Sequence, residues 1–236
     1  MKALVKLSVM GYRQIIRDGM LLVLIPLPLL VGLIFKIGIP LVNSVLEAEY
    51  EFSLENWYGM ADGLLICLSP LFTAMIMAFL LLDERDEGLN SFYQITPLAG
   101  SAYLTARIVT PLLWSFIYST AVIVIFHISK ISFVVMVAAC LLSSLTGGFL
   151  ALMIVAMAAN RVEGLAVAKL TGLSFLGLIL IWMLPEPLCY LSAFLPSFWI
   201  GKLISEGGSL FSLGGGLLVC GVWIFFFLAK YQRNYA

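Results

Sequence analysis

Charged side chains are scarce in this chain. Only 11% of its 236 residues are Asp, Glu, Lys or Arg and 62% are hydrophobic, whereas roughly a quarter of an average soluble domain is charged. The mean hydropathy is +1.09. A soluble core cannot account for so few charges, so the composition predicts a polytopic membrane protein. The formal net charge is zero, which gives no general attraction to nucleic acid, and no nucleic-acid partner is expected.

Residues that carry reaction chemistry are also few. The single histidine, His127, lies at the outer end of the third predicted span, beside Lys130, and has no neighbouring metal ligand or catalytic partner, so we expect a solvated residue at the membrane interface. The four cysteines are scattered without metal-ligand spacing and are expected to act as small apolar residues. They are Cys67, Cys140, Cys189 and Cys220. The sequence therefore predicts no catalytic residue, no metal and no cofactor, in a protein that is not an enzyme.

An energy source is missing as well. No Gly-x-x-x-x-Gly-Lys-Ser/Thr sequence occurs, and the glycine run at 214–216 lies inside a hydrophobic stretch, where it favours close helix packing. The predicted span interiors hold almost none of the ionisable groups that an ion-coupled carrier needs. Asp62, near the start of a span, is expected to be an acid at headgroup level, with a proton or cation site as the alternative. The chain is thus expected to be driven by another subunit.

What the sequence has in quantity is long apolar runs. A helix needs about 20 apolar residues to cross about 30 Å of hydrocarbon. Six runs meet that length: 21–42, 60–82, 103–128, 131–158, 166–184 and 210–229. The expected fold is all-α and integral to the membrane, a single transmembrane domain over 1–236, with the first span kinked by Pro26, Pro28 and Pro40. No cleavable signal peptide is expected at the N-terminus.

Lysine and arginine are distributed unequally between the two sides. With the N-terminus inside, ten of these residues fall on the cytoplasmic side and three on the outer side, and the positive-inside rule selects that orientation. The inner set is Lys2, Lys6, Arg13, Arg17, Arg85, Arg107, Arg161, Lys169, Lys230 and Arg233, and the outer set is Lys36, Lys130 and Lys202. The first outer loop is acidic, from Glu47 to Glu55. Six spans then place both termini in the cytoplasm of a multi-pass cell-membrane protein.

Two stretches predict local features of the bundle. Small residues in the fourth span form overlapping small-xxx-small pairs, which favours packing within one subunit, with a seam between subunits or a gate as the alternative. They are Ser143, Ser144, Gly147, Gly148 and Ala151. Between Pro185 and Trp199 the apolar pieces are too short to cross the membrane and are interrupted by proline. They are expected to dip into the outer leaflet as a re-entrant hairpin, with Trp199 at the interface.

The most charged stretch runs from Asp83 to Leu98, between the second and third spans. A polar insert there must lie in water, and its apolar residues are spaced as in a short amphipathic helix. Gly88 lets the chain turn and Thr96-Pro97 stops the helix. Residues 1–20 are basic and amphipathic, which predicts a helix in the interface plane, with a simple flank of the first span as the alternative. A shorter polar turn at 160–164 is predicted on the same side.

Together these segments resemble the type-2 (ABC-2-like) permease subunits of ATP-binding-cassette exporters. In that family the first cytoplasmic loop has a Glu-Arg pair and a glycine, followed by Thr-Pro and then by Tyr-Leu and a basic residue that open the third span. The matching residues here are Glu84-Arg85, Gly88, Thr96-Pro97, Tyr103-Leu104 and Arg107. The basic N-terminus resembles the family's connecting helix, and 160–164 and 185–199 resemble its second cytoplasmic turn and its re-entrant outer hairpin.

The resemblance implies a coupling helix after the second span that docks a separate cytosolic ATPase subunit. It also implies a path through the lipid bilayer formed by two permease subunits, identical or homologous. By that match the ATPase-coupling residues are Glu84, Arg85, Glu87, Gly88, Thr96 and Pro97; a plain solvated loop is the alternative. The apolar span interiors favour a hydrophobic or amphipathic cargo such as a drug, peptide or lipid. An ion-coupled secondary transporter and a non-transporting immunity or scaffold protein stay open as alternative functions.

Overall fold

A computed structural model describes the backbone of residues 15–88 and 100–235, and the side chains over 15–88 and 112–233. The elements in these ranges are helices joined by turns. The long helices are α3 (Leu27–Tyr50), α4 (Tyr58–Asp86), α6 (Gly100–Phe126), α7 (Phe133–Met157) and α11 (Leu210–Tyr235). The shorter ones are α2 (Gly19–Leu24), α8 (Arg161–Thr171), α9 (Leu176–Met183) and α10 (Pro196–Ser205), with 3-10 turns η1 (Glu55–Trp57), η2 (Gly172–Phe175) and η3 (Leu188–Ser192).

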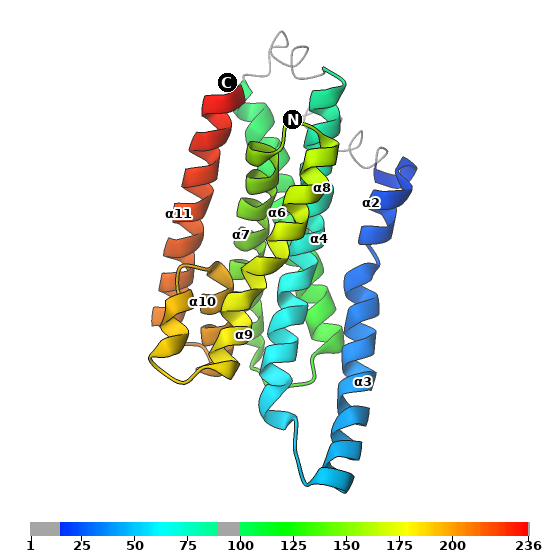
Figure 1. The fold of residues 1–236 in the computed structure, drawn as a ribbon, viewed down its shortest axis with the longest axis vertical. Helices are drawn as coiled ribbons and strands as arrows, with labels where there is room; N and C mark the ends of the chain where they lie inside the picture. Colours follow the sequence, from blue (N-terminus) through cyan, green and yellow to red (C-terminus); the bar gives the residue numbers. More distant parts are fainter. Residues whose placement is uncertain (1–14, 89–99, 236) are drawn as a thin grey trace.

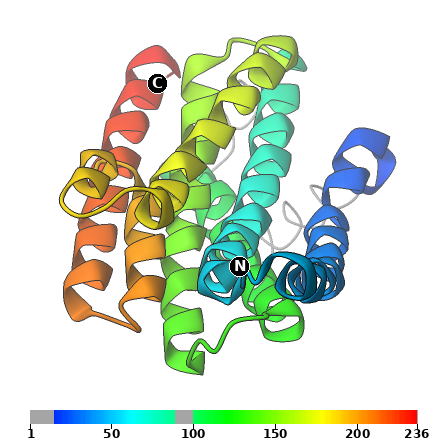
Figure 2. The same ribbon diagram turned by 60° about the horizontal axis from the view of Figure 1, so that its bottom comes forward.

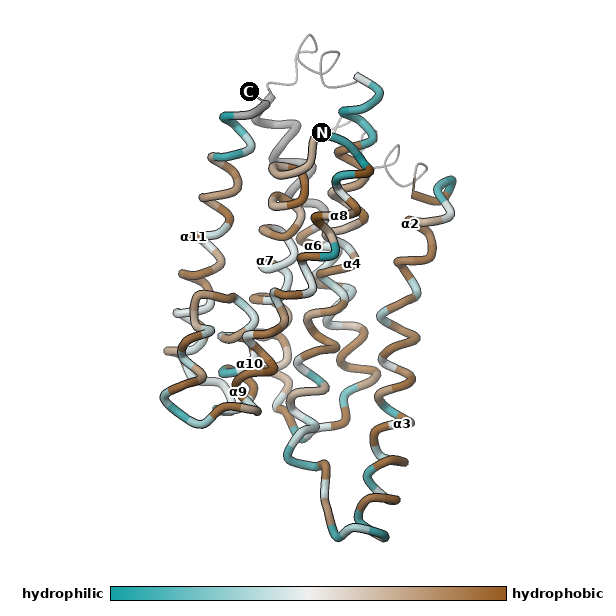
Figure 3. Tube along the Cα trace, viewed as in Figure 1, coloured by the Kyte–Doolittle hydropathy of each residue, from teal (hydrophilic) through white to brown (hydrophobic). Residues whose placement is uncertain are grey.

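Five stretches of the described chain are long and apolar enough to cross a membrane. They are Gly19–Tyr50, Glu55–Asp86, Phe133–Met157, Arg161–Met183 and Leu210–Arg233. Each coincides with a predicted span, and the remaining prediction, 103–128, falls on α6, whose described apolar part is the shorter Leu112–Phe126. Hydrophobic residues follow the middles of these helices and hydrophilic residues gather at their ends (Figure 3). The chain is therefore a multi-pass membrane protein.

Helices α4, α6 and α7 form the centre of the bundle, with α3 on one flank and α11 on the other (Figures 1 and 2). The most apolar windows of α4 and α7 are each 67% buried, whereas those of α3 and α11 are each 22% buried. Helices α8 and α9 descend across α4, and α10 packs among α9, α11 and α7. The flanking helices thus present most of their apolar surface to their surroundings.

A proline inside α4 explains how the three central helices hold together. Pro70 has no N–H, so the carbonyl of Ile66 one turn earlier lacks its helical donor. Two hydroxyls from neighbouring helices replace it: Ser119 of α6 donates to the Ile66 oxygen at 3.1 Å and Ser143 of α7 at 2.9 Å. In hydrocarbon an unsatisfied carbonyl is costly, so this exchange ties α4 to both partners.

The small residues of α7 pack inside the subunit, as one of the two sequence-based alternatives proposed. A Cβ on Gly147 would lie 2.8 Å from the Pro70 carbonyl oxygen, and one on Gly148 would lie 2.8 Å from a Leu112 methyl group of α6. In α11, a Cβ on Gly215 would lie 2.3 Å from the Trp199 ring. These glycines let helices approach more closely than any side chain would allow.

The first membrane stretch differs from its prediction at both ends. Asp18 caps α2, the helix is interrupted at Ile25–Pro26, and the Tyr118 hydroxyl of α6 donates to the Ile25 carbonyl at 2.5 Å. Helix α3 then runs on to Tyr50, so the start of the predicted acidic outer loop is helical. Lys36, counted above among the outer lysines, donates from Nζ to the Ile125 carbonyl near the end of α6 at 2.6 Å.

The other predicted extra elements have mixed outcomes. The stretch after α9 holds η3 and α10, but α10 continues to Ser205, beyond the predicted limit. Trp199, predicted at the membrane interface, packs within the bundle: it is 9% exposed, and its indole Nε1 donates to the Ala193 carbonyl at 2.8 Å. The predicted polar turn at 160–164 is the N-cap and first turn of α8. Of the predicted helix over 1–20, residues 1–14 lie outside the described chain.

Candidate functional site

The predicted coupling residues divide between the last turn of α4 and the turn that follows it. Glu84 and Arg85 belong to α4 itself, not to a separate helix, and the Glu84 side chain is buried. Glu87 is exposed and caps the helix. Gly88 has a φ of +70°, the left-handed conformation that favours glycine, as its predicted turn requires. Residues 96 and 97 of the prediction lie outside the described chain.

Arg85 fastens the end of α4 to the end of α7. Its guanidinium donates from Nη1 to the Ala158 carbonyl at 2.8 Å and from Nη2 to the Val155 carbonyl at 3.2 Å. These carbonyls terminate α7, where the helix dipole favours a cation. The same guanidinium lies 5.9 Å from the centre of the Tyr231 ring of α11. One side chain therefore joins three helices at this end of the bundle, which we call the arginine end.

Arg161, the first residue of α8, is the second arginine that joins several helices at the arginine end. It forms ion pairs with Asp18, which caps α2, and with Asp83 of α4, the latter with an Nη1–Oδ2 distance of 2.8 Å. Its backbone N–H donates to the Asp86 carboxylate at 3.2 Å. The Arg161 hydrogen bond, more than any other contact, holds the pKa of Asp18 below its usual value. Helices α2, α4 and α8 are thus held by one guanidinium.

The local sequence explains why α8 starts at this residue. The Asn160 side chain accepts a hydrogen bond from the Glu163 N–H at 2.9 Å, and the Glu163 carboxylate accepts one from the Ala159 N–H at 2.8 Å. This reciprocal arrangement resembles a capping box and satisfies backbone donors that the helix would otherwise leave open. It fixes the first turn of α8 and with it the direction of the Arg161 side chain.

A second charged cluster lies at the opposite end of the bundle, around Lys202 of α10. The Lys202 ammonium is buried, pairs with Glu186 and lies 3.3 Å from a Glu206 carboxylate oxygen and 4.7 Å from the centre of the Tyr190 ring. The Ser212 hydroxyl of α11 donates to Glu206 at 2.5 Å, and this bond, ahead of the lysine, lowers the pKa of Glu206. The lysine thereby links η3, α10 and the start of α11.

Asp62 lies near the start of α4, as expected of an acid at a helix end, and its side chain is buried against neighbouring segments. Its carboxylate accepts hydrogen bonds from the Ile128 N–H at 3.1 Å, from the Ser129 N–H at 2.9 Å and from the Ser129 hydroxyl. These donors belong to the connection between α6 and α7, next to the exposed His127. Asp62 therefore ties the start of α4 to that connection.

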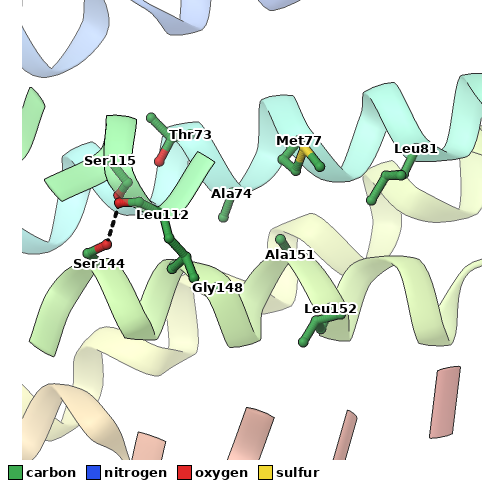
Figure 4. A pocket seen from close by; sticks show the side chains of 11 residues that line it. Thr73, Ala74, Met77, Leu81, Leu112, Ser115, Ser144, Gly148, Ala151 and Leu152 are labelled. Carbon is green, nitrogen blue, oxygen red and sulfur yellow. Dashed lines mark hydrogen bonds between the residues drawn. The ribbon is translucent and has the colours of Figure 1, made fainter. Parts of the chain in front are cut away.

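The centre of the bundle holds a small cavity between α4, α6 and α7 (Figure 4). The hydroxyls of Thr73, Ser115 and Ser144 lie at one end of it and apolar side chains at the other. The four cysteines are buried and free, as expected of small apolar residues. Among the described residues no group of His, Cys, Asp and Glu could hold a metal ion.

Known proteins resemble this chain over most of its length. Residues 11–228 match a family model described as fluoroquinolones export permease protein Rv2686c-like. The chain belongs to this permease family. Two proteins named fluoroquinolones export permease, MT2760 and Rv2686c, from two Mycobacterium tuberculosis strains (CDC 1551 / Oshkosh and ATCC 25618 / H37Rv), are each 26% identical to it over 226 residues, or 91% of this chain and 90% of theirs. No solved structure matches.

Membership of a permease family classes the chain as a transporter and not an enzyme. Several residues that form ion pairs between helices were not predicted as site residues. Lys202 entered only the count of charges on each side, Arg161 entered that count and the predicted polar turn at 160–164, and Asp18 was part of the basic N-terminal segment. Their partners are far apart in sequence, so only the fold brings them together. The capping pattern at 160–163 was the one local signal that a helix begins at Arg161.

Proposed function

We propose that this chain is the transmembrane subunit of an ATP-driven exporter of amphipathic drug-like molecules, fluoroquinolones among them, and that a separate ABC ATPase supplies the energy. Membership of the export permease family supports the transport role, and the resemblance of 83–107 to ABC-2 permeases supports the ATP-driven mechanism. Two permease subunits form the path, each with six spans and both termini in the cytoplasm. The arginine end of the bundle faces the cytosol.

The observation that supports the proposal most strongly is that two arginine side chains connect the end of α4 to neighbouring helices. Arg85 joins it to α7 and α11, and Arg161 joins it to α2 and α8. A force applied to the segment after Gly88 therefore reaches four other helices without relying on flexible loops. Asp62 joins the far end of α4 to the connection between α6 and α7, so the same helix carries the movement across the bilayer.

The difference in burial among these residues supports two different roles in the proposed coupling region. Glu84 and Arg85 have their side chains turned into the bundle and act as internal anchors of the coupling region. Glu87 and Gly88 are exposed beyond the last turn of α4 and begin the surface that the ATPase binds. Thr96 and Pro97 end that surface by the family resemblance. The ATPase cleft that receives Glu87 is expected to present a basic side chain, because an exposed carboxylate docks best against one.

Transport itself is tested with the complex reconstituted in liposomes. The permease is purified with the ATPase that accompanies it, and movement of norfloxacin, a fluorescent fluoroquinolone, is followed with and without ATP. We expect transport that requires hydrolysable ATP and stops when the ATPase subunit is omitted. Norfloxacin movement driven by a proton or sodium gradient without ATP would favour the ion-coupled alternative and refute the proposal.

Glu87→Lys tests the docking surface. The side chain is exposed, so the folded permease should keep its melting temperature, while the reversed charge meets the basic side chain expected in the ATPase cleft. We expect the affinity for the ATPase, measured by pull-down, to fall about tenfold, which corresponds to about 1.4 kcal/mol of binding free energy. Drug export should fall by a comparable factor. Glu49→Lys, an exposed glutamate at the opposite end of the bundle, is the matched control and should leave both unchanged. Equal effects of the two variants would contradict docking at the arginine end.

A further inference from the structure

The cavity between α4, α6 and α7 has a volume of about 20 Å³. Its lining comes from all three helices: Thr73, Ala74, Met77 and Leu81 of α4, Leu112 and Ser115 of α6, and Ser144, Gly147, Gly148, Ala151 and Leu152 of α7. A cavity holds a water molecule when its volume is at least about 10–15 Å³ and two or more polar groups face it. The space is therefore large enough for one water.

Ser115 is the residue in this cavity that needs a partner. Its side chain is 2% exposed, and its hydroxyl oxygen has no hydrogen-bond partner among the described residues. Serine in a helix commonly bonds a carbonyl of the preceding turn, which this hydroxyl does not do. Inside a membrane-spanning bundle a buried hydroxyl without a hydrogen bond is energetically costly. A bound molecule that pairs with this hydroxyl is therefore stabilising.

The two neighbouring hydroxyls can accept a hydrogen bond but have no proton left to donate. Thr73 Oγ1 donates to the Pro70 carbonyl at 3.0 Å, and Ser144 Oγ donates to the Leu112 carbonyl at 2.7 Å. Figure 4 shows all three hydroxyls gathered at one end of the cavity, with Met77 and Leu152 at the other. The polar end thus offers one donor and two acceptors.

We propose that one water molecule binds in this cavity. It accepts a hydrogen bond from the Ser115 hydroxyl and donates its two protons toward Ser144 Oγ and Thr73 Oγ1, so that each group at the polar end is satisfied. The site lies one turn beyond Pro70, where the hydrogen-bond ladder of α4 is already interrupted. A bound water exchanges partners more readily than a packed side chain does, so it lets α4 bend at Pro70 without leaving a carbonyl or hydroxyl unpaired.

Hydroxyl-radical footprinting of the intact chain tests the site directly, because radiolysis of a bound water releases hydroxyl radicals that oxidise side chains lining the same cavity. Met77 lines the cavity and is 6% exposed. Met136 of α7 is 4% exposed, lies outside the cavity and is closer to a helix end, so it is a conservative control. We expect Met77 to be oxidised at least fivefold faster than Met136. Equal, slow oxidation of both would mean a dry cavity or one filled by a lipid chain, and would refute the proposal.

A pair of serine variants provides an independent measurement. Ser69 of α4 is also fully buried, and its hydroxyl also has no partner among the described residues, but it does not line the cavity. Removing a truly unsatisfied hydroxyl should be neutral or stabilising. We therefore expect Ser69→Ala to keep or raise the melting temperature, and Ser115→Ala to lower it by several degrees and slow Met77 oxidation to the rate of Met136. A neutral or stabilising Ser115→Ala that leaves Met77 oxidation unchanged would overturn the assignment.

Discussion

Replacing Gly147 with alanine is expected to separate α4 from α7 and to remove most of the folded permease. The new Cβ would lie 2.8 Å from the Pro70 carbonyl oxygen and 2.9 Å from the Pro70 Cβ, and neither the backbone nor the ring can move aside. Overpacking of a core costs about 1–3 kcal/mol, and a clash with rigid backbone lies at the upper end of that range. The measurements are the melting temperature in detergent and the fraction of monodisperse protein after size-exclusion chromatography.

Gly214→Ala is the matched control for this change. It is the same substitution in another long apolar helix, but nothing lies within 4 Å of the added Cβ. Alanine is favoured over glycine in a helix by about 1 kcal/mol, so this variant should be as stable as the parent or more so. If Gly147→Ala were equally well tolerated, the contact between α4 and α7 described here would be wrong.

The sequence could predict which segments are buried in the membrane, because hydropathy is a property of single segments. It could not predict which helices touch. The small residues of α7 indicate a close approach, but Gly147 faces Pro70 of α4 and its neighbour Gly148 faces Leu112 of α6. Two adjacent residues thus serve two different helices, and a pattern in one helix does not name its partners.

Boundaries were missed where a polar side chain of the helix itself, or of its N-cap, bonds the backbone of the adjoining segment. Helix α3 extends past the predicted end of its span because Asn43 accepts a hydrogen bond from the Leu54 N–H at 2.6 Å and so holds the returning chain against the helix. Helix α8 begins before its predicted start because Asn160 and Glu163 cap it. Hydropathy marks the polar residues at both places but gives no reason for the helix to include them.

The charged end of α4 was the clearest functional signal in the sequence, yet the side chains there do not act alike. The family resemblance gave Glu84 and Glu87 one role, whereas Glu84 is buried and Glu87 is exposed only three residues later. The apolar residues whose spacing predicts a short amphipathic helix, at 89–95, lie outside the described chain. The Arg161–Asp18 pair joins residues 143 positions apart. Such pairs depend on the packing of whole helices, so charge counts could place Arg161 at one end of a span but not in an ion pair.

Arg161→Ala is expected to have the second large effect, on both stability and export. It removes the cation shared by Asp18 and Asp83, whose side chains are each 24% exposed, and leaves two carboxylates near one another. Exposed ion pairs contribute about 0–1 kcal/mol, and breaking buried ones costs about 3–5 kcal/mol. The ion pairs of Arg161 are half-buried, so their contribution lies between these two ranges. We expect the free energy of unfolding to fall by about 2 kcal/mol, which lowers the melting temperature. The pKa of Asp18 should rise, because the Arg161 hydrogen bond is what lowers it.

Two further variants separate the ion pairs from a general effect of losing a positive charge on α8. Lys169→Ala removes an exposed cation from the same helix and should change neither stability nor export. Adding Asp83→Asn to Arg161→Ala removes one of the unpaired carboxylates, so it should recover part of the melting temperature without restoring export, because the side-chain link from α8 to α4 and α2 is still missing. Full export by Arg161→Ala, with the ATPase bound and ATP hydrolysed as in the parent, would show that movement of α4 reaches the bundle by another route.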